Sequence, residues 1–122
     1  MDRTVLLNDK WHCIEGEKAP SKRAMLCEGK DFLPFESSSV FTLKKKFICP
    51  KQINDTVKIY FTGEYSGMKV FAGMNLLEGA SDEEGRTVFD ITAFIGRGIV
   101  PLTVVVDSGR VDGFYYSVKR KV

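Results

Sequence analysis

The sequence predicts an all-β fold, a two-sheet antiparallel jelly-roll sandwich formed by a single domain over residues 1–122. The composition favours strands, because Val, Ile and Thr are common and the chain carries nine Phe, four Tyr and one Trp. Short stretches of alternating apolar and polar residues recur along the chain, separated by Gly, Pro, Asn and Asp. This spacing is typical of sandwiches and jelly rolls, and no segment has the period of a long helix.

The first third of the chain has the weakest pattern. Residues 6–14 indicate a turn that leads into a short strand. Residues 15–39 contain Gly, Pro and three consecutive serines, which favours a long surface excursion. Within it we expect one short strand near residues 24–27.

Alternation is clearest after residue 40, where Phe41, Leu43 and Phe47 share one face of the first strand. The expected elements are strands over 40–49, 57–62, 68–72, 87–92, 99–106 and 114–119, connections over 63–67 and 107–113, tight turns at 73–75 and 96–98, a polar loop over 78–85 and one helical turn at 93–95. The stretch 99–106 is apolar on both faces, which predicts a central strand that is covered on both sides.

Two polar positions receive structural interpretations. Lys45 falls on the apolar face of its strand, so its ammonium group must reach water at the strand end or meet a carboxylate, with Asp90 and Asp107 as candidates. The Asp90 carboxylate is expected to accept backbone N–H groups where its strand breaks, and Thr92 to cap the helical turn that follows.

Charge excludes several partners. Eighteen basic and sixteen acidic side chains give a net charge of +2, and the short basic runs at 44–46 and 119–121 are offset by the acidic run at 82–84. This balance lacks the basic face of a nucleic-acid-binding protein. No apolar run reaches the ~20 residues of a membrane helix, and the first residues lack a leader's apolar stretch. We therefore expect no nucleic-acid or membrane partner, and a cytoplasmic location by default unless a leader was removed.

Metal and cofactor chemistry are not indicated. Cys13, Cys27 and Cys49 are odd in number and lack CxxC spacing, which argues against both a disulfide framework and a zinc site. One disulfide plus a free thiol stays open if the protein is exported. His12 is the only histidine, and the acidic run at 82–84 lacks the spacing of a calcium loop. We expect no metal and no cofactor.

Six short motifs in order span nearly the whole chain: Leu7-Asn8-Asp9-Lys10-Trp11, the aromatic-to-proline stretch 40–50, the Val-x-Ile-x-Phe-x-Gly stretch 57–63, residues 69–73, Phe89-Asp90-Ile91-Thr92 and residues 102–106. Together they resemble the sugar-binding, galactose-binding-like jelly-roll domain at the N-terminus of family 2 glycoside hydrolases. The resemblance implies that Trp11 begins the sandwich and belongs to its core.

The resemblance also implies a domain that is catalytically silent by itself. Glycoside hydrolysis usually needs two positioned carboxylates, and the family supplies them from a separate barrel. The sequence departs from the family at two places. Gly73-Met74 stands where the family has an Asn-Gly turn, and residues 107–113 do not reproduce the acidic cluster that touches sugar in many family enzymes.

The first functional hypothesis is a non-catalytic carbohydrate-binding module, free-standing or excised from a larger glycosidase. Its ligand would sit at loops on one end of the sandwich, over residues 65–67, 81–86 and 107–112. The candidate ligand-binding residues are Tyr65, Arg86, Asp107, Arg110 and Tyr116. Tyr115 and Tyr116 are also aromatic candidates, but they point to opposite sheet faces, so at most one belongs in the core.

Two other functions compete with sugar binding. The same fold can be a protein-interaction or structural domain that packs on a neighbouring domain, and the two departures from the family favour this alternative. A small enzyme that uses Cys or His chemistry is the third hypothesis, and it needs geometry that the sequence does not reveal.

Overall fold

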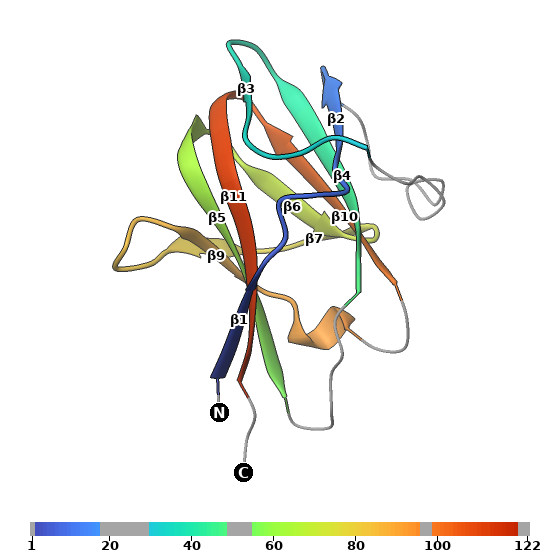
Figure 1. The fold of residues 1–122 in the computed structure, drawn as a ribbon, viewed down its shortest axis with the longest axis vertical. Coiled ribbons are helices and arrows are strands. Elements are labelled where there is room, and N and C mark those ends of the chain that lie inside the picture. The colour runs from blue at the N-terminus through green and yellow to red at the C-terminus, as the bar shows by residue number, and fades with distance from the viewer. Residues whose placement is uncertain (1, 18–29, 49–54, 96–98, 120–122) are drawn as a thin grey trace.

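The computed structural model describes residues 2–17, 30–48, 55–95 and 99–119 (Figure 1). Its elements are β1 (Asp2–Leu6), β2 (His12–Glu15), β3 (Phe35–Ser37), β4 (Phe41–Phe47), β5 (Thr56–Ser66), β6 (Lys69–Ala72), β7 (Asn75–Leu76), β8 (Gly79–Ser81), β9 (Thr87–Asp90), the 3-10 turn η2 (Thr92–Phe94), β10 (Val100–Val106) and β11 (Ser108–Lys119). The predicted all-β class is confirmed.

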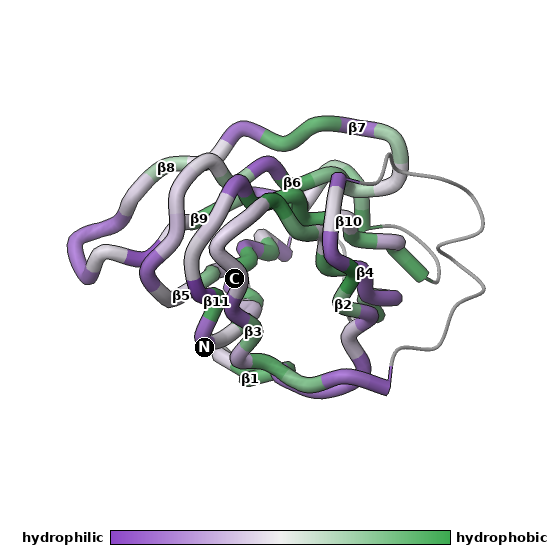
Figure 2. Tube along the Cα trace, turned by 90° about the horizontal axis from the view of Figure 1, so that it is seen from above, coloured by the Kyte–Doolittle hydropathy of each residue, from purple (hydrophilic) through white to green (hydrophobic). Residues whose placement is uncertain are grey.

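The strands form two antiparallel sheets. The six-stranded sheet has the order β1-β11-β5-β9-β8, and β3 pairs with β11 beyond the end of β1. The five-stranded sheet has the order β2-β4-β10-β6-β7. Seen from above, β11 and β5 lie on one side of the molecule and β4, β2 and β10 on the other (Figure 2). Because β1 runs beside the end of β11, both ends of the chain lie at one end of the sandwich (Figure 1).

The core between the sheets is built on aromatic rings. Trp11 is fully buried, as the resemblance implied, and its Nε1 donates a hydrogen bond to the Leu7 carbonyl at 3.0 Å. Its ring packs edge-on against Phe114 and Phe61, with centroids 5.2 and 6.4 Å away. Phe47 packs edge-on against Phe114 from the five-stranded sheet. These rings join the two sheets, since both contribute to one cluster.

Lys45 meets neither of the carboxylates expected for it. The side chain is buried, its Nζ donates to the Asp9 carbonyl at 2.6 Å, and the ammonium group lies 5.5 Å from the centre of the Trp11 ring. Burial lowers the pKa of Lys45, partly offset by Asp9. The ammonium group therefore neither reaches water at the strand end nor meets the Asp90 or Asp107 carboxylate, because a backbone carbonyl and an aromatic face hold it in the interior.

In the second half of the chain, two further expectations are confirmed and one is corrected. β10 is central in its sheet, and both of its faces are largely buried. The Asp90 carboxylate accepts the Thr92 backbone N–H at 2.9 Å, where β9 gives way to η2. Thr92 does not cap the helical turn as expected. Its hydroxyl instead accepts the Val57 N–H at 2.9 Å, which ties η2 to β5.

The long strands were predicted too short. Residues 63–67 and 107–113 were expected to connect strands, whereas β5 continues to Ser66 and β11 begins at Ser108. A bulge at Asp112 shifts the register opposite Gly63, whose φ of 140° favours glycine. The chain therefore continues through its glycines as strand instead of turning.

Three strands were also missed, and the first of them is β1, which precedes the turn expected at residues 6–14 and forms by pairing with β11. β3 lies in the expected surface excursion, and β8 replaces part of the expected loop over 78–85. Both β3 and β8 are three residues long, too short to show alternation, and each forms only by pairing with a neighbour. The strand expected near 24–27 and the turn expected at 96–98 lie outside the described residues.

Candidate functional site

The six-stranded sheet has one face that points away from the core, and we call it the outer face. The polar side chains of this sheet project from it. Val57, Ile59 and Phe61 of β5 are fully buried. Side chains alternate across a strand, so Lys58 and Tyr60 between them project onto the outer face. The same alternation along β11 buries Phe114 and Tyr116 and turns Tyr115 outward.

A row of apolar and aromatic residues crosses the outer face in register. Tyr115 of β11 is the Cα partner of Tyr60 on one side and of Leu6 on the other. Tyr60 in turn pairs with Val88 of β9. Directly opposed residues in antiparallel strands have side chains about 5 Å apart, so these form a continuous band. We call Leu6, Tyr115, Tyr60 and Val88 the aromatic row.

Tyr115 lies against the sheet beside a glycine. A Cβ built on Gly113 would be 3.1 Å from Tyr115 Cε2 and 3.0 Å from Thr62 Oγ1. Glycine thus leaves room for the ring to lie along the strand. The ring is half-buried, and among the described residues its hydroxyl has no hydrogen-bond partner. Leu6 beside it is 52% exposed, so the row is open to solvent here.

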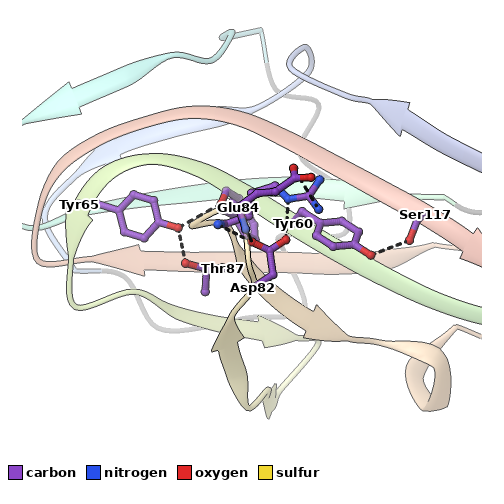
Figure 3. Close-up of polar contacts among 8 residues, drawn as sticks. Tyr60, Tyr65, Asp82, Glu84, Thr87 and Ser117 are labelled. Carbon is purple, nitrogen blue, oxygen red and sulfur yellow. Dashed lines mark hydrogen bonds and ion pairs between the residues drawn. The ribbon is translucent and has the colours of Figure 1, made fainter.

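Tyr60 is held from two sides. Its hydroxyl and the Ser117 hydroxyl are 3.1 Å apart, and the Arg86 guanidinium lies 4.6 Å from the ring centre (Figure 3). Arg86 in turn donates through Nε to Asp82 at 2.7 Å and lies 3.5 Å from a Glu84 carboxylate oxygen. One face of the Tyr60 ring is therefore covered, and the ring is fixed in place beside Tyr115.

The loop that carries Arg86 is organised by Asp82. One Asp82 oxygen accepts the backbone N–H groups of Glu84 and Arg86, at 3.0 and 2.8 Å. Desolvation alone would raise the pKa of Asp82, but the hydrogen bonds from Arg86 and Glu84 outweigh it and hold this pKa below its ordinary value. Asp82 is therefore a permanent anion that positions Arg86.

Two hollows lie along the outer face, one towards each end. The acidic hollow, about 450 Å³, is lined by Glu36, Ser37, Ser38, Glu64, Ser108, Gly109 and Arg110. The basic hollow, about 300 Å³, is lined by Thr4, Thr56, Lys58, Tyr60, Ser117, Val118 and Lys119. Tyr60 borders the basic hollow, and Glu64 of the acidic hollow lies four positions further along β5, about 13 Å of strand. The aromatic row thus lies between the hollows.

Three of the five residues predicted to bind a ligand, Arg86, Arg110 and Asp107, lie on or beside the outer face. They form two separate groups. Arg86 lies over Tyr60, and Arg110 lines the acidic hollow, where its Nε donates to Asp112 at 2.6 Å. Asp107 is exposed in the β10–β11 turn next to this hollow, where its N–H donates to the Ser66 carbonyl. The predicted loop residues Arg86, Asp107 and Arg110 and the outer face therefore lie on the same side of the sandwich.

The two predicted tyrosines face inward instead. Tyr116 is only 7% exposed and packs edge-on against Phe47, so its ring offers no face to a ligand. Tyr65 packs on the core, and its hydroxyl contacts the Thr87 hydroxyl and the Phe61 carbonyl (Figure 3). Burial raises the pKa of Tyr65. The aromatic residues on the outer face are Tyr60 and Tyr115. The sequence signal that could have identified Tyr60 is strand alternation, which groups it with Lys58 on the polar face.

The thiol and imidazole on β2 are poorly placed for catalysis. His12 and Cys13 are adjacent in the strand, so they project to opposite faces. Burial, with the nearby Asp31 carboxylate, raises the pKa of Cys13 to about 11, so the thiol is protonated at neutral pH. Cys27 and Cys49 lie outside the described residues.

Metal-binding clusters and membrane-spanning helices are both absent from the described part of the chain. Within these residues, no three His, Cys, Asp or Glu side chains gather as metal ligands. Likewise, none of the helical segments in this part is long and apolar enough to span a membrane.

Comparison with known proteins gives the fold. No protein-family model and no curated protein matches the sequence. Solved structures that are similar include a glycosyl hydrolase family 2 member from Bacteroides cellulosilyticus, with a TM-score of 0.78 at 12% identity over 97% of this chain and 21% of that chain. The chain shares its fold with part of these glycosidases.

Two further structures agree. Bacteroides uniformis beta-glucuronidase 2 gives a TM-score of 0.75 at 12% identity, over 97% of this chain and 18% of that chain. A beta-glycosidase from Bacteroides vulgatus gives 0.73 at 17% identity, over 95% of this chain and 20% of that chain. The chain spans about a fifth of the length of each of these proteins. The resemblance predicted from six motifs is confirmed as a similarity of fold.

Proposed function

We propose that the chain is a non-catalytic carbohydrate-binding domain whose ligand lies on the outer face, centred on Tyr115. The observation that carries this is the open tyrosine ring lying beside Gly113. A flat phenol ring packs against the apolar C–H face of a pyranose, and its hydroxyl bonds sugar hydroxyls. Arg86 and the Tyr60 hydroxyl offer further polar contacts at the border of the row. The glycosidases that share this fold support a sugar ligand.

Two carboxylates on this side of the molecule, those of Asp82 and Asp112, fit binding better than hydrolysis. A glycosidase needs one carboxylic acid with a raised pKa to protonate the leaving group. Asp82 instead has a lowered pKa and is committed to Arg86. Asp112 is committed to Arg110. Each of these two carboxylates orients a guanidinium group.

Replacing Tyr115 with alanine is expected to weaken glycan binding about tenfold, because the stacking surface disappears while the fold stays intact. Isothermal titration calorimetry with galactose-containing oligosaccharides would measure the loss. Phe71→Ala is the matched control, since Phe71 is a half-buried aromatic residue on the five-stranded sheet. Equal losses for the two variants, or no binding by the wild type at millimolar sugar, would contradict the proposal.

A second candidate function is packing against another domain. Met74 and Leu76 are 67% and 59% exposed at the β6–β7 hairpin, and Leu76 pairs with Phe71 at the edge of the five-stranded sheet. An apolar patch on an edge strand is typical of an interface. The glycosidases that share the fold are about five times as long, which suits a neighbouring domain as the partner.

An isolated chain is expected to self-associate as its concentration rises, because Met74 and Leu76 are exposed and association would bury their apolar side chains. Sedimentation velocity would show it, and Leu76→Lys should restore the monomer. A wild-type chain that stays monomeric at the highest concentration would count against the patch as an interface.

A further inference from the structure

The basic hollow differs from the rest of the outer face in its charge. Among the described residues, its lining contains two ammonium groups, those of Lys58 and Lys119, and no carboxylate. Hydroxyl groups of Thr4, Thr56 and Ser117 complete the lining. Ammonium and hydroxyl groups are the donors that hold a carboxylate or a sulfate.

Neither lysine is used by the fold. Both side chains are exposed, and among the described residues neither forms an ion pair within 4.0 Å. Each lysine has one acidic neighbour by register: Asp90 on β9 is the Cα partner of Lys58, with which it interacts electrostatically, and Asp2 on β1 is the Cα partner of Lys119. Asp90 does not line the hollow, and its carboxylate accepts the backbone N–H of Thr92. Among the described side chains, no carboxylate lines the hollow or lies within 4.0 Å of either ammonium group, so both groups can bind a ligand anion in competition with the neighbouring aspartates.

The opposite end of the outer face has the reverse character. Arg110 stands between Glu36 and Glu64 in the strand register, and its guanidinium is already bonded to Asp112. The two glutamates leave the acidic hollow with an excess of negative charge. A ligand lying along the face therefore meets positive charge at one end only, which fixes its direction.

We infer that the basic hollow is an anion subsite, which receives the carboxylate or sulfate of an acidic sugar while a pyranose ring lies on Tyr115. This inference rests on the proposed carbohydrate function and names its ligand class, an oligosaccharide with an acidic residue at one end. Ser117 is two residues from Tyr115 along β11, about 7 Å, so one sugar unit can touch both the ring and the hollow. A chain with acid groups along its whole length would meet Glu36 and Glu64.

Three sugars test the inference by titration: galactose, galacturonic acid and galactose 6-sulfate. The wild type is expected to bind the two acidic sugars roughly 3- to 10-fold more tightly than galactose, the range for two exposed charge contacts. The preference should shrink as salt is added, because exposed charges are screened. The two acidic sugars distinguish a carboxylate from a sulfate as the natural group.

The double variant Lys58→Gln/Lys119→Gln should lose the preference and keep the affinity for galactose. Lys69→Gln is the matched control, an exposed lysine on the five-stranded sheet. If galactose and galacturonic acid bind equally well to the wild type, or the double variant keeps the preference, the anion subsite is overturned and carbohydrate binding stands. If none of the three sugars binds, both proposals fall.

Discussion

Replacing Trp11 with alanine is expected to lower the free energy of unfolding by about 4 kcal/mol, the largest loss we expect from a single side chain. Trp11 is fully buried, contacts Phe61 and Phe114, and donates a hydrogen bond to the Leu7 carbonyl. The substitution leaves a cavity between the sheets and an unsatisfied carbonyl. It also removes the aromatic face beside the buried Lys45 ammonium group, which adds an electrostatic cost.

Urea unfolding followed by circular dichroism would measure this loss, because the secondary structure is almost entirely strand. Phe32→Ala serves as the control, since Phe32 is 68% exposed and its loss should change stability by well under 1 kcal/mol. A Trp11→Ala variant within about 1 kcal/mol of the wild type would contradict the placement of this ring in the core.

The second large effect is expected at the β5–β11 bulge. Gly63 has a φ of 140°, and a Cβ there would lie 2.1 Å from the Arg110 carbonyl oxygen and 2.9 Å from the Asp112 nitrogen. Gly63→Ala therefore combines backbone strain with a backbone collision, and we expect a loss of about 3 kcal/mol or more. Neither strand can move aside easily, because β5 and β11 pair along nearly their whole length.

Gly85→Ala separates the two contributions in the same unfolding experiment. Gly85 also has a positive φ, 77°, but a Cβ at this position would have no atom within 4 Å, so only strain of about 1 kcal/mol remains. Equal losses for Gly63→Ala and Gly85→Ala would show that β5 and β11 do not approach each other closely enough at the bulge to exclude a methyl group.

The bulge also decides which tyrosine faces solvent. Val111 pairs with Gly63 and Gly113 with Thr62, so Asp112 is an extra residue in β11. If Asp112 instead paired with Thr62 in regular register, Phe114 would oppose Tyr60, and Tyr115 would oppose Ile59 on the core face. The sequence shows that Tyr115 and Tyr116 lie on opposite faces, but not which is outside, because one unpaired residue reverses the answer.

The strands of the second half could be predicted because alternation records burial directly. In β4, β9 and β10 the apolar residues sit where the core requires them. Contacts that depend on register or on loop conformation could not be predicted. The partner of Lys45 is a backbone carbonyl, and Arg86 reaches Tyr60 only because Asp82 folds the loop that carries it.

The candidate ligand residues show the same division. Arg86 and Arg110 were chosen from expected loops, and the structure places Arg86 over Tyr60 and Arg110 in the lining of the acidic hollow. Tyr65 and Tyr116 were chosen as aromatic residues, but both pack on the core. The face that each side chain occupies depends on how the strand alternation continues past the glycines and the bulge. The pairing of Tyr60 with Tyr115 needs the register between two strands about 50 residues apart in the chain.

The most direct test of the account is a map of where sugar binds. In a titration of isotopically labelled protein with galactose and galacturonic acid, followed by amide chemical shifts, we expect changes centred on Tyr60, Tyr115 and Ser117. Galacturonic acid should extend them to Lys58 and Lys119. Changes confined to the hairpin of Met74 and Leu76, or no changes at millimolar sugar, would contradict a carbohydrate site on the outer face.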